Sequence, residues 1–302
     1  MKNERLHKKN ASFSGPLSIV LFVVLCFYVL SLVIPLVWGF FASLKGNMDF
    51  SMNPVGFPAG NITEWKWSNY SYVIKNFNVP IIDGTNTYVV PFLGLLINTL
   101  IYTVVCAAAG AFAPCVMGYL LAQYPNRFSS VIRVMILVAI TLPIVGSNAS
   151  MLEFLRSIGL YDTYAALLLM SYNPITIYLF IYEASFSGLS RAYTESAQID
   201  GAGNFRIFFT INLPLVRNIF FTIFILMFIG RWNDYTVPLM YTPTKPTLAY
   251  GVWFINNSTI PGLNWPPAKI TGLMILAIPV LILFVIFNRR IMGNVSMGGV
   301  KE

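Results

Sequence analysis

Six long apolar stretches constrain this chain more than any other feature. Each is rich in Leu, Ile, Val and Phe and is long enough for a helix that crosses a bilayer, which takes about 20 residues. Because lipid offers the backbone no hydrogen-bond partners, stretches of this kind must be helical. We therefore expect an all-α integral membrane protein with six transmembrane helices. The predicted spans cover residues 17–43, 91–121, 131–149, 164–186, 218–240 and 270–288.

The composition favours a single membrane domain over residues 1–302. Apolar residues make up 57% of the chain and charged residues 10%, against about 45–50% and about 25% in soluble domains. The longest hydrophilic segment has about 45 residues, which is too short to bury an independent core. The three cysteines lie in apolar stretches, and His7 is the only histidine. We therefore expect no metal, no cofactor and no catalytic residue.

Lysine and arginine indicate the orientation. The amino-terminal tail, the loops after the second and fourth spans and the carboxy-terminal tail hold twelve of them, whereas the remaining loops hold six. The positive-inside rule therefore places the first set, with both termini, in the cytoplasm. The net charge of +8 then reflects cytoplasmic loops rather than an affinity for nucleic acid. The long loop 45–88 is expected to cap the outer surface, and 151–162 to form a short amphipathic helix there.

The cytoplasmic loop 187–217 between the fourth and fifth spans is polar and contains glycine. Ser190 is a suitable N-cap for a short helix over Arg191–Asp200. Gly201 can adopt a positive φ, so it is expected to end that helix and turn the chain. A second short helix is expected over Asn204–Ile211. The sequence thus predicts a helix–turn–helix on the cytoplasmic face.

This loop resembles the EAA loop of bacterial ABC-importer permeases. The family pattern is Glu-Ala-Ala, three residues, Gly, nine residues, Ile, one residue and Leu-Pro. The residues at that spacing are Glu195, Ala197, Gly201, Ile211, Leu213 and Pro214. Asp200 and Ala202 match the Asp-Gly-Ala that is usual in sugar permeases, while Ser196 replaces the second residue of the pattern.

Further segments resemble the carbohydrate permeases, and the maltose-transporter G-type subunit most of all. Asn98-Thr99 resembles an Asn-Ser of that family, and the run Trp232–Tyr235 with Pro238-Leu239 resembles its Trp-Asn-Asp-Phe and Pro-Leu. The segment Met297–Lys301 resembles its terminal Gly-x-Val-Lys-Gly. The resemblance implies the type I ABC importer permease fold, in a multi-pass subunit of the bacterial cytoplasmic (inner) membrane.

The resemblance also implies a mechanism and partners. The EAA loop would form a coupling helix, made by Glu195, Ser196, Ala197, Asp200, Gly201 and Ala202, that docks on a cytoplasmic ATPase dimer. The chain would pair with a second permease subunit. An extracytoplasmic solute-binding protein would deliver its cargo, a carbohydrate, for which an oligosaccharide is favoured. It has no Gly-x-x-x-x-Gly-Lys-Ser/Thr motif, so ATP hydrolysis would belong to a separate chain.

Charges inside the fifth span are the candidates for the translocation path. Arg231 and Asp234 lie at i, i+3, a spacing that allows a mutual salt bridge. Intramembrane charges usually face a cavity or each other. Arg231, Trp232, Asn233 and Asp234 could line the path, because amides bond sugar hydroxyls and an indole stacks on a pyranose ring. Alternatively, the pair packs internally against neighbouring helices. Glu183, near the inner end of the fourth span, is expected at an interface or a gate.

Three other classes fit the sequence less well. An ABC permease for a non-sugar solute would share the loop but not the Trp-Asn-Asp run. A membrane enzyme would need a histidine cluster, a carboxylate pair or a nucleophile elbow. A stand-alone channel or secondary carrier often contains an inverted repeat, and none is evident in this sequence.

Overall fold

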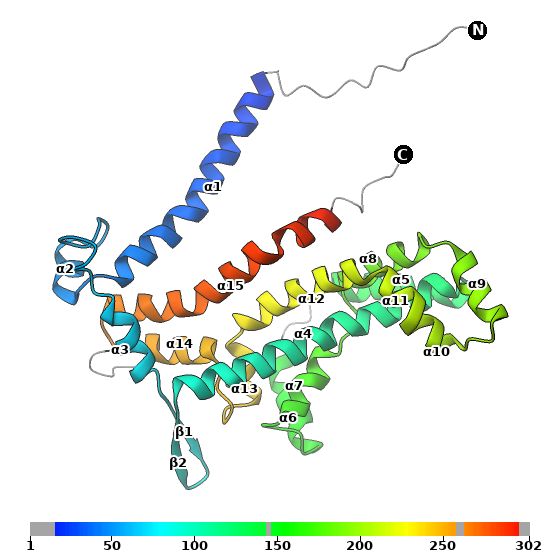
Figure 1. Cartoon of the computed structure of the whole chain (residues 1–302). Helices are drawn as coiled ribbons and strands as arrows, with labels where there is room; N and C mark the ends of the chain where they lie inside the picture. The colour runs from blue at the N-terminus through cyan, green and yellow to red at the C-terminus, as the bar shows by residue number, and fades with distance from the viewer. Residues whose placement is uncertain (1–15, 143–145, 258–262, 296–302) are drawn as a thin grey trace.

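A computed structural model describes residues 16–142, 146–257 and 263–295. Within them the chain is mainly helical, as expected, with one β-hairpin that an all-α prediction misses (Figure 1). Two segments used above lie outside the described residues. They are the basic amino-terminal tail, whose charges helped to predict the orientation, and Met297–Lys301, which resembles the terminal segment of the carbohydrate permeases.

Three described helices are long and apolar enough to cross a membrane, and they match the first, second and sixth predicted spans. They are α1 (Pro16–Ser43), α4 (Phe92–Gln123) and α15 (Pro266–Val295). A fourth crossing is possible if the segment Asn204–Leu215 and the helix Arg217–Trp232, which meet at an angle of 78°, count as one span. The number six therefore stays a prediction.

The fourth predicted span consists of two helices, α7 (Tyr164–Ser171) and α8 (Ile177–Ser187). The chain breaks between them at Asn173 and Pro174. Proline has no backbone N–H with which to continue a helix, and the Oδ1 atom of Asn173 accepts a hydrogen bond from the N–H of Ile175 at 2.9 Å. The bend expected from these two residues is therefore a complete interruption of the helix.

The third and fifth predicted spans are also shorter than expected. α5 (Arg127–Thr141) has 15 residues. The next helix is α6 (Ser147–Ser157), and residues 143–145 between them are not among the described residues. α12 (Arg217–Trp232) ends well before residue 240, and a separate short helix, α13 (Thr236–Tyr241), follows it. An unbroken helix over 218–240 is therefore wrong.

The core of the helical body surrounds α4, which packs most extensively against α8 and α12. Gly118 on α4 allows the close approach of α8. A Cβ atom at Gly118 would lie 2.7 Å from the Cβ of Tyr182 and 2.9 Å from the carbonyl oxygen of Leu179. Around this crossing, Cys115 and Tyr182 are fully buried and Ile223 of α12 nearly so. α4 runs through Pro114 without a break.

α1 stands apart from this body (Figure 1). None of the residues in its most apolar window is buried within the described chain. Its second half packs along α15, where a Cβ atom at Gly39 would lie 3.0 Å from the Cε of Met274. α1 thus exposes to lipid or to a partner a surface that a soluble protein would bury.

The predicted outer loop is structured. It contains α2 (Asn47–Met52), α3 (Ser68–Asn76) and an antiparallel hairpin of β1 (Val79–Asp83) and β2 (Asn86–Val90). In the hairpin Val79 pairs with Val90, and Gly84 takes φ 59° in the turn. The remaining elements are α14 (Leu248–Asn257) and, in the loop 187–217, α9 (Arg191–Ile199), α10 (Asn204–Ile207), the π-helical turn η1 (Phe208–Asn212) and α11 (Leu213–Leu215).

Candidate functional site

The loop 187–217 forms the expected helix–turn–helix at the end of the molecule opposite α2 and α3 (Figure 1). α9 ends in a Schellman motif. The N–H of Ala202 donates to the carbonyl of Ala197 at 2.9 Å, and the N–H of Gly201 donates to that of Gln198 at 3.0 Å. This motif needs a left-handed residue after the helix, and Gly201 has φ 77°. The chain turn therefore depends on the glycine that the sequence singled out.

The candidate coupling residues divide between two faces of α9. Ala197 is buried, as is Thr194 one turn before it, so this face rests on the protein body. Glu195, Ser196, Asp200 and Gly201 are exposed, and Ala202 is half-buried. Ser190 occupies the N-cap position, but its side chain makes no capping bond. The exposed set forms one continuous edge around the turn.

Two apolar side chains on this edge were missed by the sequence analysis. Ile199 is 86% exposed and Phe205 is 84% exposed, and they flank the Gly201 turn. Large exposed apolar patches often mark contact sites for other proteins, so this pair is a candidate contact. Their signal in the sequence is weak, because single Ile and Phe residues within a polar loop resemble ordinary helix-packing residues.

The second half of the loop is anchored in the helical body. Phe208 of η1 is buried, with its ring centroid 4.8 Å from that of Tyr119 on α4 and 6.5 Å from that of Phe186 on α8. Pro214 lies in α11 as expected for a helix start. The following bend of 78° leads directly into α12. A displacement of the loop would therefore be passed to α4, α8 and α12.

A polar hollow of about 190 Å³ lies beneath α9. It contains Glu183 of α8, whose Oε1 accepts a hydrogen bond from the Nε of Arg133 on α5 at 2.9 Å. Arg191 and Thr194 of α9 border the same hollow. Glu183 is thus an interface residue between two helices, which is one of the two roles expected for it.

The charges near the end of α12 form a compact cluster with α4. The hydroxyl of Tyr102 donates to Oδ2 of Asp234 at 2.7 Å, and Nη1 of Arg231 lies 3.4 Å from both of these oxygens. The expected salt bridge between Arg231 and Asp234 is therefore present. Oδ1 of Asp234 accepts the N–H groups of Thr236 and Val237 at 3.0 and 3.1 Å, which caps α13.

Within the run Arg231–Asp234 the side chains have different surroundings. Trp232 is buried, stacks on Phe228 and donates its indole N–H to the carbonyl of Leu276 at 2.9 Å. Asp234 bonds on both oxygens within the protein. Asn233 is exposed and donates to the carbonyl of Ile229 at 2.9 Å. Arg231 retains a partly exposed guanidinium. Only Arg231 and Asn233 therefore present polar atoms outward.

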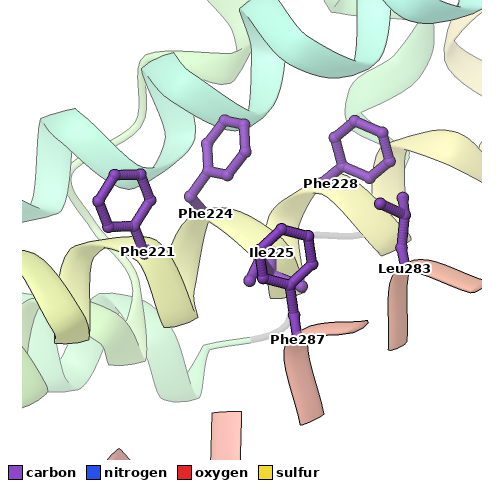
Figure 2. A pocket seen from close by; sticks show the side chains of 6 residues that line it. All are labelled: Phe221, Phe224, Ile225, Phe228, Leu283 and Phe287. Atoms are coloured by element: carbon purple, nitrogen blue, oxygen red, sulfur yellow. The ribbon is translucent and has the colours of Figure 1, made fainter. Parts of the chain in front are cut away.

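An apolar hollow of about 300 Å³ lies between α12 and α15 (Figure 2). Three phenylalanine rings of α12 border it, and Leu283 and Phe287 of α15 face them. The α12 residues that line it are Phe221, Phe224, Ile225 and Phe228. This lining offers no hydrogen-bonding side chain to a polar cargo, so the hollow differs in chemistry from the Arg231 cluster.

Comparison with known proteins adds a family and several relatives. Residues 115–296 match the model of the binding-protein-dependent transport system inner membrane component. The diacetylchitobiose uptake system permease protein NgcG of Streptomyces coelicolor is 24% identical over 97% of this chain and 92% of its own length. The trehalose transport system permease protein SugB of Mycobacterium tuberculosis is 30% identical over 70% and 77%. The arabinooligosaccharides transport system permease protein AraQ of Bacillus subtilis is 27% identical over 73% and 76%.

Among solved structures, a chain of a bacterial ABC transporter involved in the import of the acidic polysaccharide alginate has a similar fold. The TM-score is 0.69 at 20% sequence identity, and the match covers 90% of this chain and 95% of that one. The matched family region contains the α9–α10 loop and the run Arg231–Asp234, whereas Tyr102, which bonds to Asp234, lies before it. Apart from Tyr102, the two candidate sites therefore lie in the part of the chain on which the family match rests.

Proposed function

The chain belongs to the family of binding-protein-dependent transport system inner membrane components, and we propose that it is the permease subunit of an ATP-driven carbohydrate importer. The observation that carries this proposal is the exposed edge of α9 and its glycine turn, which provides a docking surface on a chain without a nucleotide-binding motif. The cargo class is supported by the relatives, whose names specify diacetylchitobiose, trehalose and arabinooligosaccharides.

In this proposal α9 is the coupling helix. Glu195, Ser196 and Asp200 would contact a cytoplasmic ATPase subunit through polar groups, and Ile199 and Phe205 would fill apolar depressions on it. Ala197, Gly201 and Ala202 would set the shape of the turn. Because Phe208 and α11 tie the loop to the body, closure of an ATPase dimer would move α12 and α4 and so alternate the access of the path.

The polar atoms of Arg231 and Asn233 are the proposed contribution of this chain to the sugar path. A guanidinium and a carboxamide can both hydrogen-bond hydroxyls, and the guanidinium can also hold an acidic sugar. Trp232 and Asp234 would act indirectly by fixing the end of α12. A second permease subunit would complete the path, and an extracytoplasmic solute-binding protein would deliver the sugar. Both termini of this chain would be cytoplasmic.

The experiment is uptake into proteoliposomes that contain this chain, its partner permease and the ATPase, with the cognate solute-binding protein outside. Mono- and oligosaccharides are offered singly, with an amino acid and a polyamine as non-sugar cargoes. We expect uptake of a sugar that requires ATP inside and the binding protein outside. Uptake of a non-sugar alone would overturn the cargo class, and ATP-independent uptake would overturn the importer mechanism.

A further inference from the structure

Lys45 is the most deeply buried cation of the described chain, and it has no acidic partner there. The residue is 1% exposed, and its ammonium donates a hydrogen bond to the carbonyl oxygen of Asn53. The salt bridges among the described residues all involve other side chains, so no described carboxylate lies within 4 Å of the Lys45 ammonium. A buried charge is costly unless it is paired. Lys45 therefore lacks a counter-ion that an outside anion could supply.

Lys45 lines a groove of about 570 Å³, together with Lys66 and Lys75. These two lysines are exposed, and their ammonium groups have no hydrogen-bond or ion-pair partner within the described chain. No Asp or Glu lines the groove. Asp49 and Glu64 border an adjoining hollow that Lys66 also lines, and they accept the backbone N–H groups of Ala59 and Asn61 at 3.1 and 3.3 Å.

Hydrogen bonds tie α3 to the end of α1 beside the groove. The Nδ2 atom of Asn69 donates to the carbonyls of Ser43 and Lys45 at 2.8 and 2.9 Å. The end of α1 at Ser43 lies beside the start of α15 at Pro266 (Figure 1). Residues next to both ends line the groove, so we place it where these two apolar helices would leave a bilayer.

Aromatic residues support this placement at the membrane boundary. Trp265 and Tyr72 line the groove, and both are about half exposed. Trp67 nearby is 47% exposed. Half-exposed tryptophans and tyrosines are typical of the headgroup level of a membrane. The exposed apolar side chains of α1 lead from this level into the hydrocarbon region, so an acyl chain could lie along α1 while its headgroup reaches the groove.

We propose that this groove binds the phosphate of an anionic phospholipid, with Lys45 as its buried counter-charge and Lys66 and Lys75 as its exposed contacts. A carboxylate on a protein partner would satisfy the same ammonium groups, but the position at the ends of two spans and the aromatic border favour a lipid. The proposal requires the membrane location of the family and is independent of the cargo and of the coupling role of α9.

The test uses the assembled transporter in nanodiscs of phosphatidylglycerol or of phosphatidylcholine, with thermal unfolding and retained lipid measured by native mass spectrometry. We expect the wild type to retain phosphatidylglycerol and to unfold at a higher temperature in it. The Lys66→Gln/Lys75→Gln variant should bind this lipid more weakly by about fivefold for each lysine removed, since each lysine near an anionic surface contributes about that factor.

Lys45→Met keeps the aliphatic stem but removes the buried charge. We expect the difference in unfolding temperature between the two lipids to become smaller in this variant, although Lys66 and Lys75 remain. A variant that merely packs badly would unfold at a lower temperature in both lipids and keep the difference. Lys269→Gln is the matched control, because Lys269 does not line the groove and donates to the carbonyl of Asn256 at 3.1 Å. It should retain the lipid preference of the wild type.

Three outcomes would overturn the proposal. The lysine variants could keep the full preference for phosphatidylglycerol. Inorganic phosphate added in phosphatidylcholine nanodiscs could stabilise the wild type as much as phosphatidylglycerol does, which would indicate a free anion. The Lys66→Gln/Lys75→Gln variant could keep its lipid but lose capture of the solute-binding protein, which would assign the groove to a protein partner.

Discussion

Two regions of the molecule treat their polar and apolar groups differently. At the predicted outer side, the backbone N–H, the carbonyl and the carboxylate of Asp162 all bond within the chain. Around α9, acidic and apolar side chains are exposed. The N–H of Asp162 donates to the carbonyl of Tyr241 at 3.0 Å, and its carboxylate accepts the hydroxyl of Thr244 at 2.6 Å. The Nζ of Lys245 donates to the Asp162 carbonyl and lies 3.4 Å from its Oδ1. We name Asp162, Thr244 and Lys245 the rim clasp.

The rim clasp and the α9 turn both contain a residue with positive φ. At Asp162 φ is 60°, which is unusual for a residue other than glycine, and at Gly201 it is 77°. The strain at Asp162 is offset by its internal bonds. The turn at Gly201 instead carries a surface without internal partners. This contrast favours a stabilising role for the rim clasp and, as proposed above, an associating role for the loop. The experiments that follow test it.

Replacement of Gly201 with tryptophan should have the largest effect. A side chain at φ 77° is strained, by about 1–2 kcal/mol, and an indole at the turn would obstruct docking. We expect ATP-driven uptake to fall at least a hundredfold. Gly203→Ala is the matched control, because Gly203 has φ −73° and open space around it. Unchanged uptake in Gly201→Trp would show that this turn does not couple transport to ATP.

Polar substitution of the exposed apolar pair should come next. Ile199→Ser/Phe205→Ser removes surface that only a partner could bury, so we expect weaker co-purification with the ATPase and about tenfold lower uptake, as for a contact worth about 1.4 kcal/mol. The unfolding temperature should not fall. Ile82→Ser serves as the control, since Ile82 is 78% exposed on the hairpin. An equal effect of both changes would remove the distinction between the two ends.

Arg231→Ala should lower sugar uptake severalfold while assembly and ATPase docking remain. The measurement is the concentration of sugar-loaded binding protein that gives half-maximal uptake, with assembly followed by size-exclusion chromatography. Tyr102→Phe is the companion variant. It removes the hydroxyl that contacts Asp234 and Arg231 but adds no polar or charged group. Loss of assembly in Arg231→Ala would indicate that the guanidinium only packs the helices.

Asp162→Asn should have the smallest effect on transport. Asparagine tolerates the left-handed backbone but lacks the charge that pairs with Lys245, so we expect a loss of about 1 kcal/mol in stability. The unfolding temperature should fall by a few degrees, while uptake per folded transporter stays unchanged. Asp83→Asn, in the exposed hairpin, is the control. A selective loss of uptake would give the rim clasp a role in transport.

The sequence allowed the best predictions where one residue type has one physical use. A glycine between two amphipathic stretches was enough to predict the α9 turn, because few other residues adopt positive φ. The long spans followed from apolar length in the same way. The interruptions were harder to foresee, since Asn173 and Asp234 lie between two helices and accept N–H groups of the residues that follow them. Side chains that accept such bonds can equally well lie within a helix.

The periodicity of the sequence could not predict which way individual side chains point at the ends of helices. Trp232 resembled a sugar-stacking group, yet it is buried against Phe228 and Leu276. Ile199 and Phe205 were not singled out in the sequence, and both are exposed. Which way a side chain points at the end of a helix depends on the neighbouring helices, and those contacts are between residues distant in sequence.

The bend of 78° between α11 and α12 bears on how far a rotation of α12 would move the residues at its other end. α12 has 16 residues, so it is about 24 Å long. Treated as a rigid lever with its pivot at Val216, it would carry Trp232 and Arg231 through about 4 Å for a rotation of about 10°, given that length. A displacement of that size exceeds the length of a hydrogen bond. A small tilt imposed at the α11 end would therefore be enough to break the bonds that α12 makes with other helices at its far end, such as those of Trp232 to Leu276 and of Arg231 to Tyr102.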